Sequence, residues 1–293
     1  KFPDSEKVFT SVSPFANIEV YKSSYLHFAP GLSDTAALYL EEMPKEAYLG
    51  MYMDGSGPIG IMKTLPQSQQ AYFKFLPMAM PFLLKDNPET LIMSFGGGIS
   101  TNVALGLGAK SITVAEGNPM VTAAVMDEGY LKDFTGDILR HEKVTLAPME
   151  GRIFARSTDQ RFDIIDLSLA DSTGLSMSGG SSIHEDYSYT RETFESLMNV
   201  LAEDGIIGVT VWNKQDAPKS TLRLMNTVIQ AAQETADTEN IDNRFFIAHT
   251  YLSSLTVLYK RDGFTEEETK KLIKHCRKMS FTVVHAPGKQ APD

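Results

Sequence analysis

Residues 90–116, TLIMSFGGGISTNVALGLGAKSITVAE, decide the fold. An apolar run over Thr90–Phe95 predicts a strand, and three glycines follow it directly. A helix is expected over Thr101–Leu107, and Ser111–Ala115 predicts a second strand. Strand, glycine turn, helix and strand in this order are typical of a βαβ unit with parallel strands. This stretch therefore favours an α/β protein.

The same alternation continues toward the C-terminus. Asn118 and Pro119 suit the cap and the first turn of a helix after the second strand. Apolar runs predict strands at Lys143–Ala147, Phe162–Leu169, Ile206–Trp212, Phe245–Leu252 and Leu255–Lys260, and helical spacing predicts helices around Phe194–Leu201, Leu222–Ala232 and Thr265–Met279. The last two strands are close enough to form a hairpin. We expect a doubly wound α/β domain with a mostly parallel sheet and a late antiparallel hairpin.

The region before this unit has a shorter, extended pattern. Strands are expected at Ile18–Tyr21, Ala37–Leu40 and Gly50–Met53, the last of them before an Asp-Gly turn signal. Two prolines interrupt Gln67–Leu84, which we interpret as a bridging segment. The expected organisation is a small β domain over residues 1–66, a nucleoside-binding Rossmann-like domain over 67–286 and a tail over 287–293.

Composition excludes several classes of protein. A net charge of −10 argues against an electrostatic nucleic-acid surface and is compatible with small cationic substrates. The longest apolar run, Phe75–Leu84, is far shorter than the roughly 20 residues that span a bilayer, so we expect a soluble domain. The sequence leaves the compartment open, with the cytoplasm favoured. The single cysteine, Cys276, excludes an internal disulfide and a cysteine-cluster metal site.

The glycine turn and the end of the next strand are the strongest candidates for a binding site. Gly96, Gly97 and Gly98 would let the backbone approach a ligand closely at a helix N-terminus, although a purely structural tight turn is an equal alternative. Glu116 lies 20 residues beyond Gly96 (116 − 96), where a carboxylate can accept hydrogen bonds from both hydroxyls of a ribose. The spacing favours nucleoside binding.

Two further segments follow later strands. Glu150 and Gly151 come after a strand, where the carboxylate could receive an adenine amino group; a surface turn is the alternative. Asp171 leads into a serine- and glycine-rich loop that reaches Ser182. This loop could cover an active site as a lid, or it could be a plain surface connection.

The order of these elements resembles the spermidine synthases, which are polyamine aminopropyltransferases. Ser13–Val20 is similar to the family's opening strand, and Met53-Asp54-Gly55 to its turn. Asn87–Gly98 resembles the entry to its nucleoside site, and Val114-Ala115-Glu116 its ribose-binding position. The stretches Phe162–Ser172 and Glu185–Phe194 look most like a bacterial subset in which this domain is fused to membrane-spanning segments.

The resemblance implies the methyltransferase-type fold and a group donor, either S-adenosylmethionine or its decarboxylated form, with no metal. It implies that Gly96–Gly98, Glu116, Glu150 and Gly151 bind this donor. The acceptor would be a polyamine or another amine. A homodimer and membrane segments outside these residues are compatible with the resemblance, whereas a nucleic-acid partner is not expected.

The residues for catalysis depart from the family pattern. An isoleucine, Ile99, stands where the family has an aspartate that binds the donor's amino group. The family's principal catalytic aspartate falls on Ser168 and its second one on Asp171, which makes Asp171 the best candidate to take a proton from the amine. Asp166 would serve if the strand register differed by two residues. Tyr72 lies near the family's substrate tyrosine, with a buried packing role as the alternative.

Three functions remain open from the sequence. The resemblance implies aminopropyl transfer to a polyamine. Methyl transfer from S-adenosylmethionine is the alternative on the same fold, because a fold does not by itself fix a reaction. The altered residues Ile99 and Ser168 also motivate a domain that senses a nucleoside or a polyamine without turnover.

Overall fold

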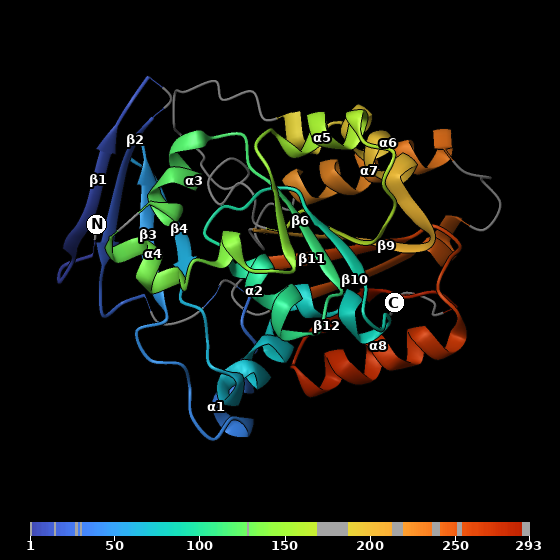
Figure 1. The fold of residues 1–293 in the computed structure, drawn as a ribbon. Helices are drawn as coiled ribbons and strands as arrows, with labels where there is room; N and C mark the ends of the chain where they lie inside the picture. Colours follow the sequence, from blue (N-terminus) through green and yellow to red (C-terminus); the bar gives the residue numbers. More distant parts are fainter. Residues whose placement is uncertain are drawn as a thin grey trace.

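The computed structural model describes residues 2–14, 16–26, 29, 31–127, 129–168, 187–212, 219–235, 241–250 and 254–288. Its strands form two sheets (Figure 1). The smaller sheet is antiparallel and has the order β1-β2-β3-β4. Its strands are β1 (Glu6–Val12), β2 (Asn17–Lys22), β3 (Tyr48–Met53) and β4 (Ser56–Met62).

The larger sheet has the order β12-β10-β11-β9-β8-β5-β6-β7. Its strands are β5 (Glu89–Ile92), β6 (Ser111–Ala115), β7 (Val144–Ala147), β8 (Phe162–Asp166), β9 (Leu201–Trp212), β10 (Phe245–Thr250), β11 (Ser254–Lys260) and β12 (Thr282–His285). The run from β9 to β7 is parallel, whereas β11, β10 and β12 pair antiparallel. The expected α/β fold, with its late hairpin and its preceding antiparallel unit, is confirmed.

Helices cover both faces of the larger sheet. The α-helices are α1 (Ala36–Tyr39), α2 (Ile99–Gly106), α3 (Pro119–Met126), α4 (Tyr130–Thr135), α5 (Gly151–Ser157), α6 (Arg191–Val200), α7 (Lys219–Thr235) and α8 (Glu266–Lys278). Short 3-10 helices are η1 (Gln67–Phe75), η2 (Pro77–Ala79), η3 (Pro81–Leu83), η4 (Ile138–Arg140), η5 (Tyr187–Tyr189) and η6 (Ile241–Arg244). Helices α5, α6 and α7 lie over one face, and α8 lies over the other (Figure 1). None of the described helices is long and apolar enough to cross a membrane.

Two helix starts follow the sequence signals closely. The side chain of Asn118 accepts a hydrogen bond from the Met120 N–H at 3.0 Å, with Pro119 in the first turn of α3. Thr265 and Glu268 form a reciprocal capping box at the start of α8. Because these caps satisfy N–H groups that a helix leaves unpaired, the boundaries are set locally.

Three expectations about elements need correction. Ala37–Leu40 is not a strand: its first three residues lie in α1, and Leu40 is the C-cap, whose N–H donates to the Ala36 carbonyl. The Leu38 side chain is 79% exposed. The bridging segment Gln67–Leu84 contains the helices η1 to η3. After α8 the chain returns to the sheet as β12, which pairs with β10.

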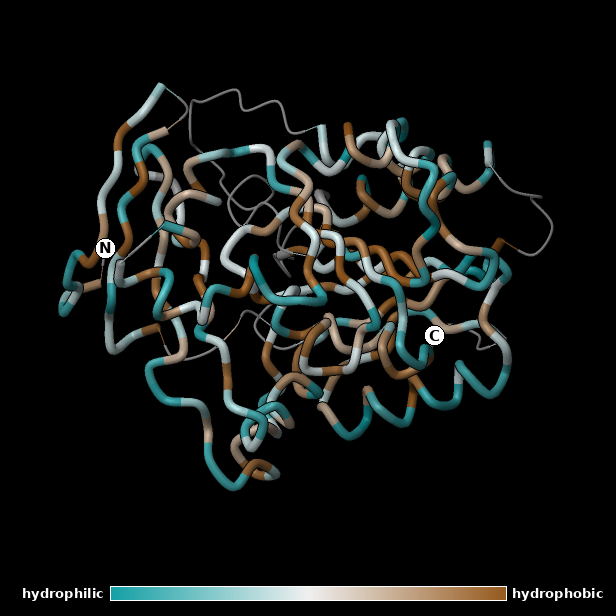
Figure 2. Tube along the Cα trace, in the orientation of Figure 1, coloured by the Kyte–Doolittle hydropathy of each residue, from teal (hydrophilic) through white to brown (hydrophobic). Residues whose placement is uncertain are grey.

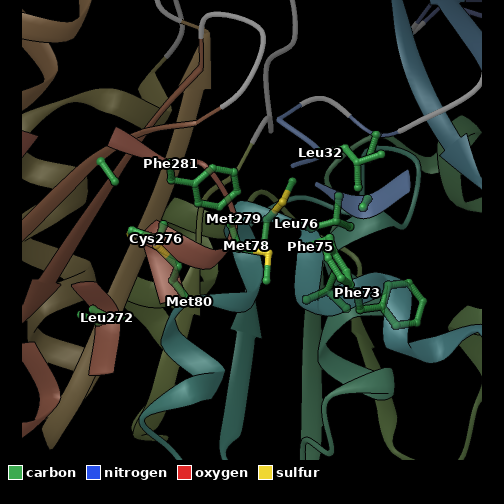
Figure 3. Close-up of a cluster of buried hydrophobic side chains, with 14 of the residues drawn as sticks. Leu32, Phe73, Phe75, Leu76, Met78, Met80, Leu272, Cys276, Met279 and Phe281 are labelled. Atoms are coloured by element: carbon green, nitrogen blue, oxygen red, sulfur yellow. Dashed lines mark hydrogen bonds between the residues drawn. The ribbon is translucent and has the colours of Figure 1, made fainter. Parts of the chain in front are cut away.

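The hydrophobic core between the larger sheet and α8 is rich in sulfur-containing side chains. Met78, Met80, Cys276 and Met279 gather there beside Phe281 (Figure 3). The Cys276 Sγ lies 4.0 Å from the Met80 Sδ, and burial raises the pKa of the thiol to about 12. Cys276 is therefore an inert core residue. Along the rest of the fold, hydrophobic stretches concentrate on the central strands, whereas α8 turns a hydrophilic face outward (Figure 2).

Lys260 is a buried lysine at the end of the larger sheet where β9 begins. The Lys260 Nζ, on a residue that is 3% exposed, contacts Glu268 Oε1 at 2.8 Å and Asp204 Oδ1 at 2.6 Å. Lys85 also pairs with Asp204. Burial alone would lower the pKa of Lys260, but the hydrogen bonds to Asp204 and Glu268 outweigh it and raise the pKa. The ammonium stays charged, and this cluster ties β11 to α8.

We predict that His275, near the end of α8, makes stability fall in weak acid. Burial and the nearby charge of Lys278 lower its pKa from 6.5 to about 4, and its Nε2 has no hydrogen-bond partner among the described residues. The unfolded chain therefore binds a proton on His275 more readily than the folded chain does. The contribution of neutral His275 to the free energy of unfolding is complete above pH 6.5 and declines as the pH falls toward 4. Between pH 7 and pH 5 the loss should be about 2 kcal/mol.

Urea unfolding at the two pH values measures this loss in the wild type and in His275→Gln. The variant should lose about 2 kcal/mol less than the wild type, since every other titrating group is shared. An equal loss in both proteins would show that His275 does not titrate in this range.

Candidate functional site

The carboxyl ends of β8, β5 and β6 form one continuous edge. In the parallel register Ile92 of β5 lies between Asp166 of β8 and Val114 of β6. The chain leaves β5 toward Gly96, and it leaves β6 toward Glu116. Since neighbouring strands lie about 4.8 Å apart, residues leaving β8 and β6 are about 10 Å apart across this edge. Ligands of open α/β sheets bind at such a position, where the connections from the central strand diverge to opposite sides.

The glycine bend, Gly96–Gly98, is shaped for close backbone approach. Gly96 has a φ of +55° and Gly98 a φ of +81°, which only glycine adopts readily, and Gly98 caps α2. A Cβ at Gly97 would overlap the backbone of Gly60 in β4 and lie 2.7 Å from the Ile61 Cα. The Met62 N–H donates to the Gly97 carbonyl at 2.8 Å. One side of the bend is therefore committed to packing on the smaller sheet.

Glu116 stands beside this bend. Its Oε1 accepts from the Asn118 N–H at 2.8 Å, and the Ser94 hydroxyl donates to its Oε2 at 3.4 Å. Burial raises the pKa of Glu116, and hydrogen bonds from the backbone of Asn118 and Gly96 offset part of that shift. The link to Gly96 brings together the two elements that the sequence analysis assigned to one pocket. The carboxylate is oriented by the backbone and remains partly exposed.

Glu150 lies across from Glu116, beyond the next strand. A Cβ at Gly117 would come within 2.8 Å of the Glu150 Cγ, so the two turns touch because Gly117 has no side chain. Glu150 Oε2 accepts from the Arg152 Nε at 2.8 Å, and the Arg152 guanidinium lies 4.9 Å from the centre of the Tyr187 ring. Gly151 packs against the Met93 backbone. The proposed adenine contact thus joins the same edge, with its carboxylate already paired to a cation.

Asp166 and Ser168 complete the edge at β8. Asp166 is 3% exposed, and its Oδ1 accepts from the Ser168 hydroxyl at 2.7 Å. Ser100, in the first turn of α2, also donates to this carboxylate. Burial raises the pKa of Asp166, and the hydrogen bonds from Ser100 and Ser168 offset part of the shift. A carboxylate with a raised pKa at a strand end is a candidate proton acceptor.

Of the other predicted residues, Tyr72 lies apart from this cluster. Tyr72 is 0% exposed, and its hydroxyl lies 2.9 Å from that of Tyr48, deep in the core; burial raises its pKa. This position favours the packing role over contact with a substrate. Ile99 reaches toward Gly60 of β4, so an apolar side chain lies next to the glycine bend. Asp171 and the polar loop up to Ser182 lie outside the described residues.

Sequence reasoning missed three residues that orient the site. Ser94 interrupts an otherwise apolar strand end, Ser100 follows the glycine bend by two positions, and Arg152 follows Glu150 by two positions. Only the polar character of Ser94 gave a signal in the sequence, since the contacts of Ser100 and Arg152 depend on the fold. Among the described residues no three His, Cys, Asp or Glu side chains are grouped to hold a metal ion.

Comparison with solved structures agrees with this fold. Similar solved structures include the spermidine synthase of Thermotoga maritima (15% identity, TM-score 0.53, 91% of this chain and 78% of that one). A spermidine synthase bound to the transition-state analogue AdoDATO is also similar (16% identity, TM-score 0.55, 91% of this chain and 79% of that one). A probable spermidine synthase from Corynebacterium glutamicum ATCC 13032 is similar as well (15% identity, TM-score 0.60, 97% of this chain and 95% of that one).

These likenesses establish the fold. No curated protein matches the chain significantly. The sequence profile of the spermine/spermidine synthase domain matches residues 108–271, which is more than half of the chain and includes Glu116, Glu150, Asp166 and Ser168. The chain therefore belongs to the spermine/spermidine synthase domain family, a family of transferases.

Proposed function

We propose that this protein transfers an aminopropyl group from decarboxylated S-adenosylmethionine to an amine acceptor of the polyamine class. The observation that carries the proposal is the arrangement of Glu116, the glycine bend and Asp166 on three neighbouring strand ends. A span of about 10 Å between the outer two strands matches a nucleoside whose ribose lies at one end and whose reacting group lies at the other. Family membership and the similar structure with AdoDATO support the same reaction class.

The donor fits residues that are already oriented. Glu116 would accept hydrogen bonds from the ribose hydroxyls, because its carboxylate is partly exposed and is held in place by the backbone of Asn118 and Gly96. Glu150 would receive the adenine amino group, and its pairing with Arg152 orients the carboxylate. The first turn of α2 presents N–H groups next to a bend without side chains.

The proposal of a polyamine as the acceptor rests on the net charge of the chain and on its family membership. A net charge of −10 attracts a polyamine, which is a cation at neutral pH. Ile99 stands next to the bend in place of an acid and reaches toward Gly60 of β4, so this position gives the donor's tail no ionic anchor. This difference supports a donor whose tail is recognised less by charge than in the family pattern.

Product analysis tests the proposal and separates it from the alternatives. The protein is incubated with putrescine and either S-adenosylmethionine or its decarboxylated form. Methylthioadenosine release from the decarboxylated donor is the expected result, because aminopropyl transfer leaves that thioether. S-adenosylhomocysteine would instead indicate methyl transfer. A donor-dependent rise in melting temperature without either product would indicate a sensing domain.

A further inference from the structure

We propose that Ser168 and Asp166 act together as a proton relay, with the Ser168 hydroxyl taking the proton of the attacking amine and passing its own to Asp166. This inference rests on the proposed function. The sequence presents Ser168 as a poor proton acceptor, since an isolated hydroxyl is only weakly basic. In the structure it is not isolated, because its Oγ donates to Asp166 Oδ1 at 2.7 Å.

The two residues divide the tasks that a single carboxylate would perform. Asp166 is 3% exposed, so it is too deeply buried to meet a polyamine directly. Ser168 is partly exposed and follows the strand end by two positions, so its hydroxyl stands between the carboxylate and the outside. The Ser168 N–H also points at Asp166, to Oδ2 at 3.3 Å, which fixes the turn that carries the hydroxyl. Of these two residues, the serine is the one that can touch the amine.

Asp166 is suited to be the final acceptor. Burial raises the pKa of Asp166 above its usual range, so the carboxylate holds a proton more readily than an exposed one. The described neighbours of its carboxylate are the hydroxyl of Ser100 on α2, the hydroxyl and backbone N–H of Ser168, and Gly208 of β9, none of which carries charge. Ser100 links it to the helix that starts at the glycine bend. The proton acceptor is therefore anchored to the donor site.

The step balances without another reagent. The acceptor arrives as an ammonium. One of its protons moves to Ser168 Oγ as the hydroxyl proton moves to Asp166 Oδ1, which leaves a neutral amine, a neutral serine and a protonated carboxyl group that later releases its proton to water. The freed lone pair on nitrogen forms a bond to the carbon beside the sulfonium, and the carbon–sulfur bond breaks with its electron pair going to sulfur. The sulfur becomes a neutral thioether, and the nitrogen of the product carries the positive charge.

Steady-state kinetics with decarboxylated S-adenosylmethionine and putrescine test the relay in four proteins. Ser168→Ala and Asp166→Asn should each lower kcat by about 10²- to 10⁴-fold, while the donor dissociation constant changes less than about threefold. Ser168→Asp, which places a carboxylate directly at the open position, should recover part of kcat. Ser157→Ala is the matched control: its hydroxyl donates to Phe154 at the end of α5, and kcat should be unchanged.

The double variant Ser168→Ala/Asp166→Asn separates a relay from two independent effects. If the residues act as one unit, it should be no slower than the worse single variant. Should Asp166→Asn fail to fold, the Ser168 variants decide, because Ser168 is not in the core.

The two proposals fail in different ways. Wild-type turnover together with an unimpaired Ser168→Ala overturns the relay alone. No methylthioadenosine from the wild type overturns the proposed function and the relay with it.

Discussion

Glu116→Ala is expected to weaken nucleoside binding by about 10- to 150-fold for each ribose hydrogen bond that it removes. A hydrogen bond to a charged group contributes about 1.5–3 kcal/mol, and the carboxylate has one oxygen for each hydroxyl. The effect should be large because the Asn118 N–H and Ser94 hold Glu116 in place before the ligand arrives. Calorimetric titration with S-adenosylmethionine and with methylthioadenosine measures the loss.

Glu116→Gln is the matched variant for this experiment. It keeps the size of the side chain and one acceptor oxygen but removes the charge, so its affinity should fall between those of the wild type and the alanine variant. The melting temperature of each variant must be measured as well, because the Asn118 N–H loses its partner in the alanine variant. Unchanged affinity in a folded Glu116→Ala protein would remove the ribose assignment.

Gly97→Ala is expected to destabilise the fold by about 3 kcal/mol, at the upper end of the range for overpacked sites. The added methyl group would overlap the backbone of Gly60 and approach the Ile61 Cα, and backbone atoms cannot rotate out of the way as a side chain can. The bend would have to leave β4 and give up the hydrogen bond from Met62 to Gly97. Urea unfolding should show a lower midpoint with an unchanged slope, and donor binding should weaken too.

Gly60→Ala is the control on the opposite side of the same contact. A Cβ there meets the Ile99 Cδ1 at 3.4 Å, which is ordinary contact with the end of a flexible side chain. The cost should stay below about 1 kcal/mol. Equal stability of the two alanine variants would contradict the close approach of the bend to β4.

The elements that sequence reasoning located well are those with local causes. β6 begins and ends at the predicted residues Ser111 and Ala115, and α8 starts at the Thr265 cap. Both follow from hydrophobic periodicity or capping within a few residues. The strand prediction for Ala37–Leu40 was wrong because a short run of apolar residues resembles a strand. A helix of a single turn is too short to show the helical spacing of apolar residues in its sequence. β12 was missed because its four residues are identified by their pairing with β10.

The candidate site was predictable in outline only. The spacing of Gly96 and Glu116 predicted two elements that meet, and the backbone hydrogen bond from Gly96 to Glu116 joins them. The contact between Gly97 and Gly60 links positions far apart in the sequence, and no local pattern records it. Ser168 and its partner Asp166 are only two residues apart, but the burial of Asp166 depends on the strands packed around it, which the local sequence does not specify. The roles of Glu150, Asp171 and the other site residues remain predictions.

The ionic cluster around Lys260 has a consequence for engineering. β9 and β11 are antiparallel, so Lys260 and Asp204 lie at the end of the sheet from which the parallel strands start, on the side remote from Glu116 and Ser168. Removing one member of a buried ion pair is costly, but replacing the whole group with well-packed apolar residues is often neutral or favourable. Replacing the buried Lys260 and its partner Glu268 together with well-packed apolar residues is therefore a route to equal or higher thermal stability, and it should leave the chemistry at the opposite end of the sheet unchanged.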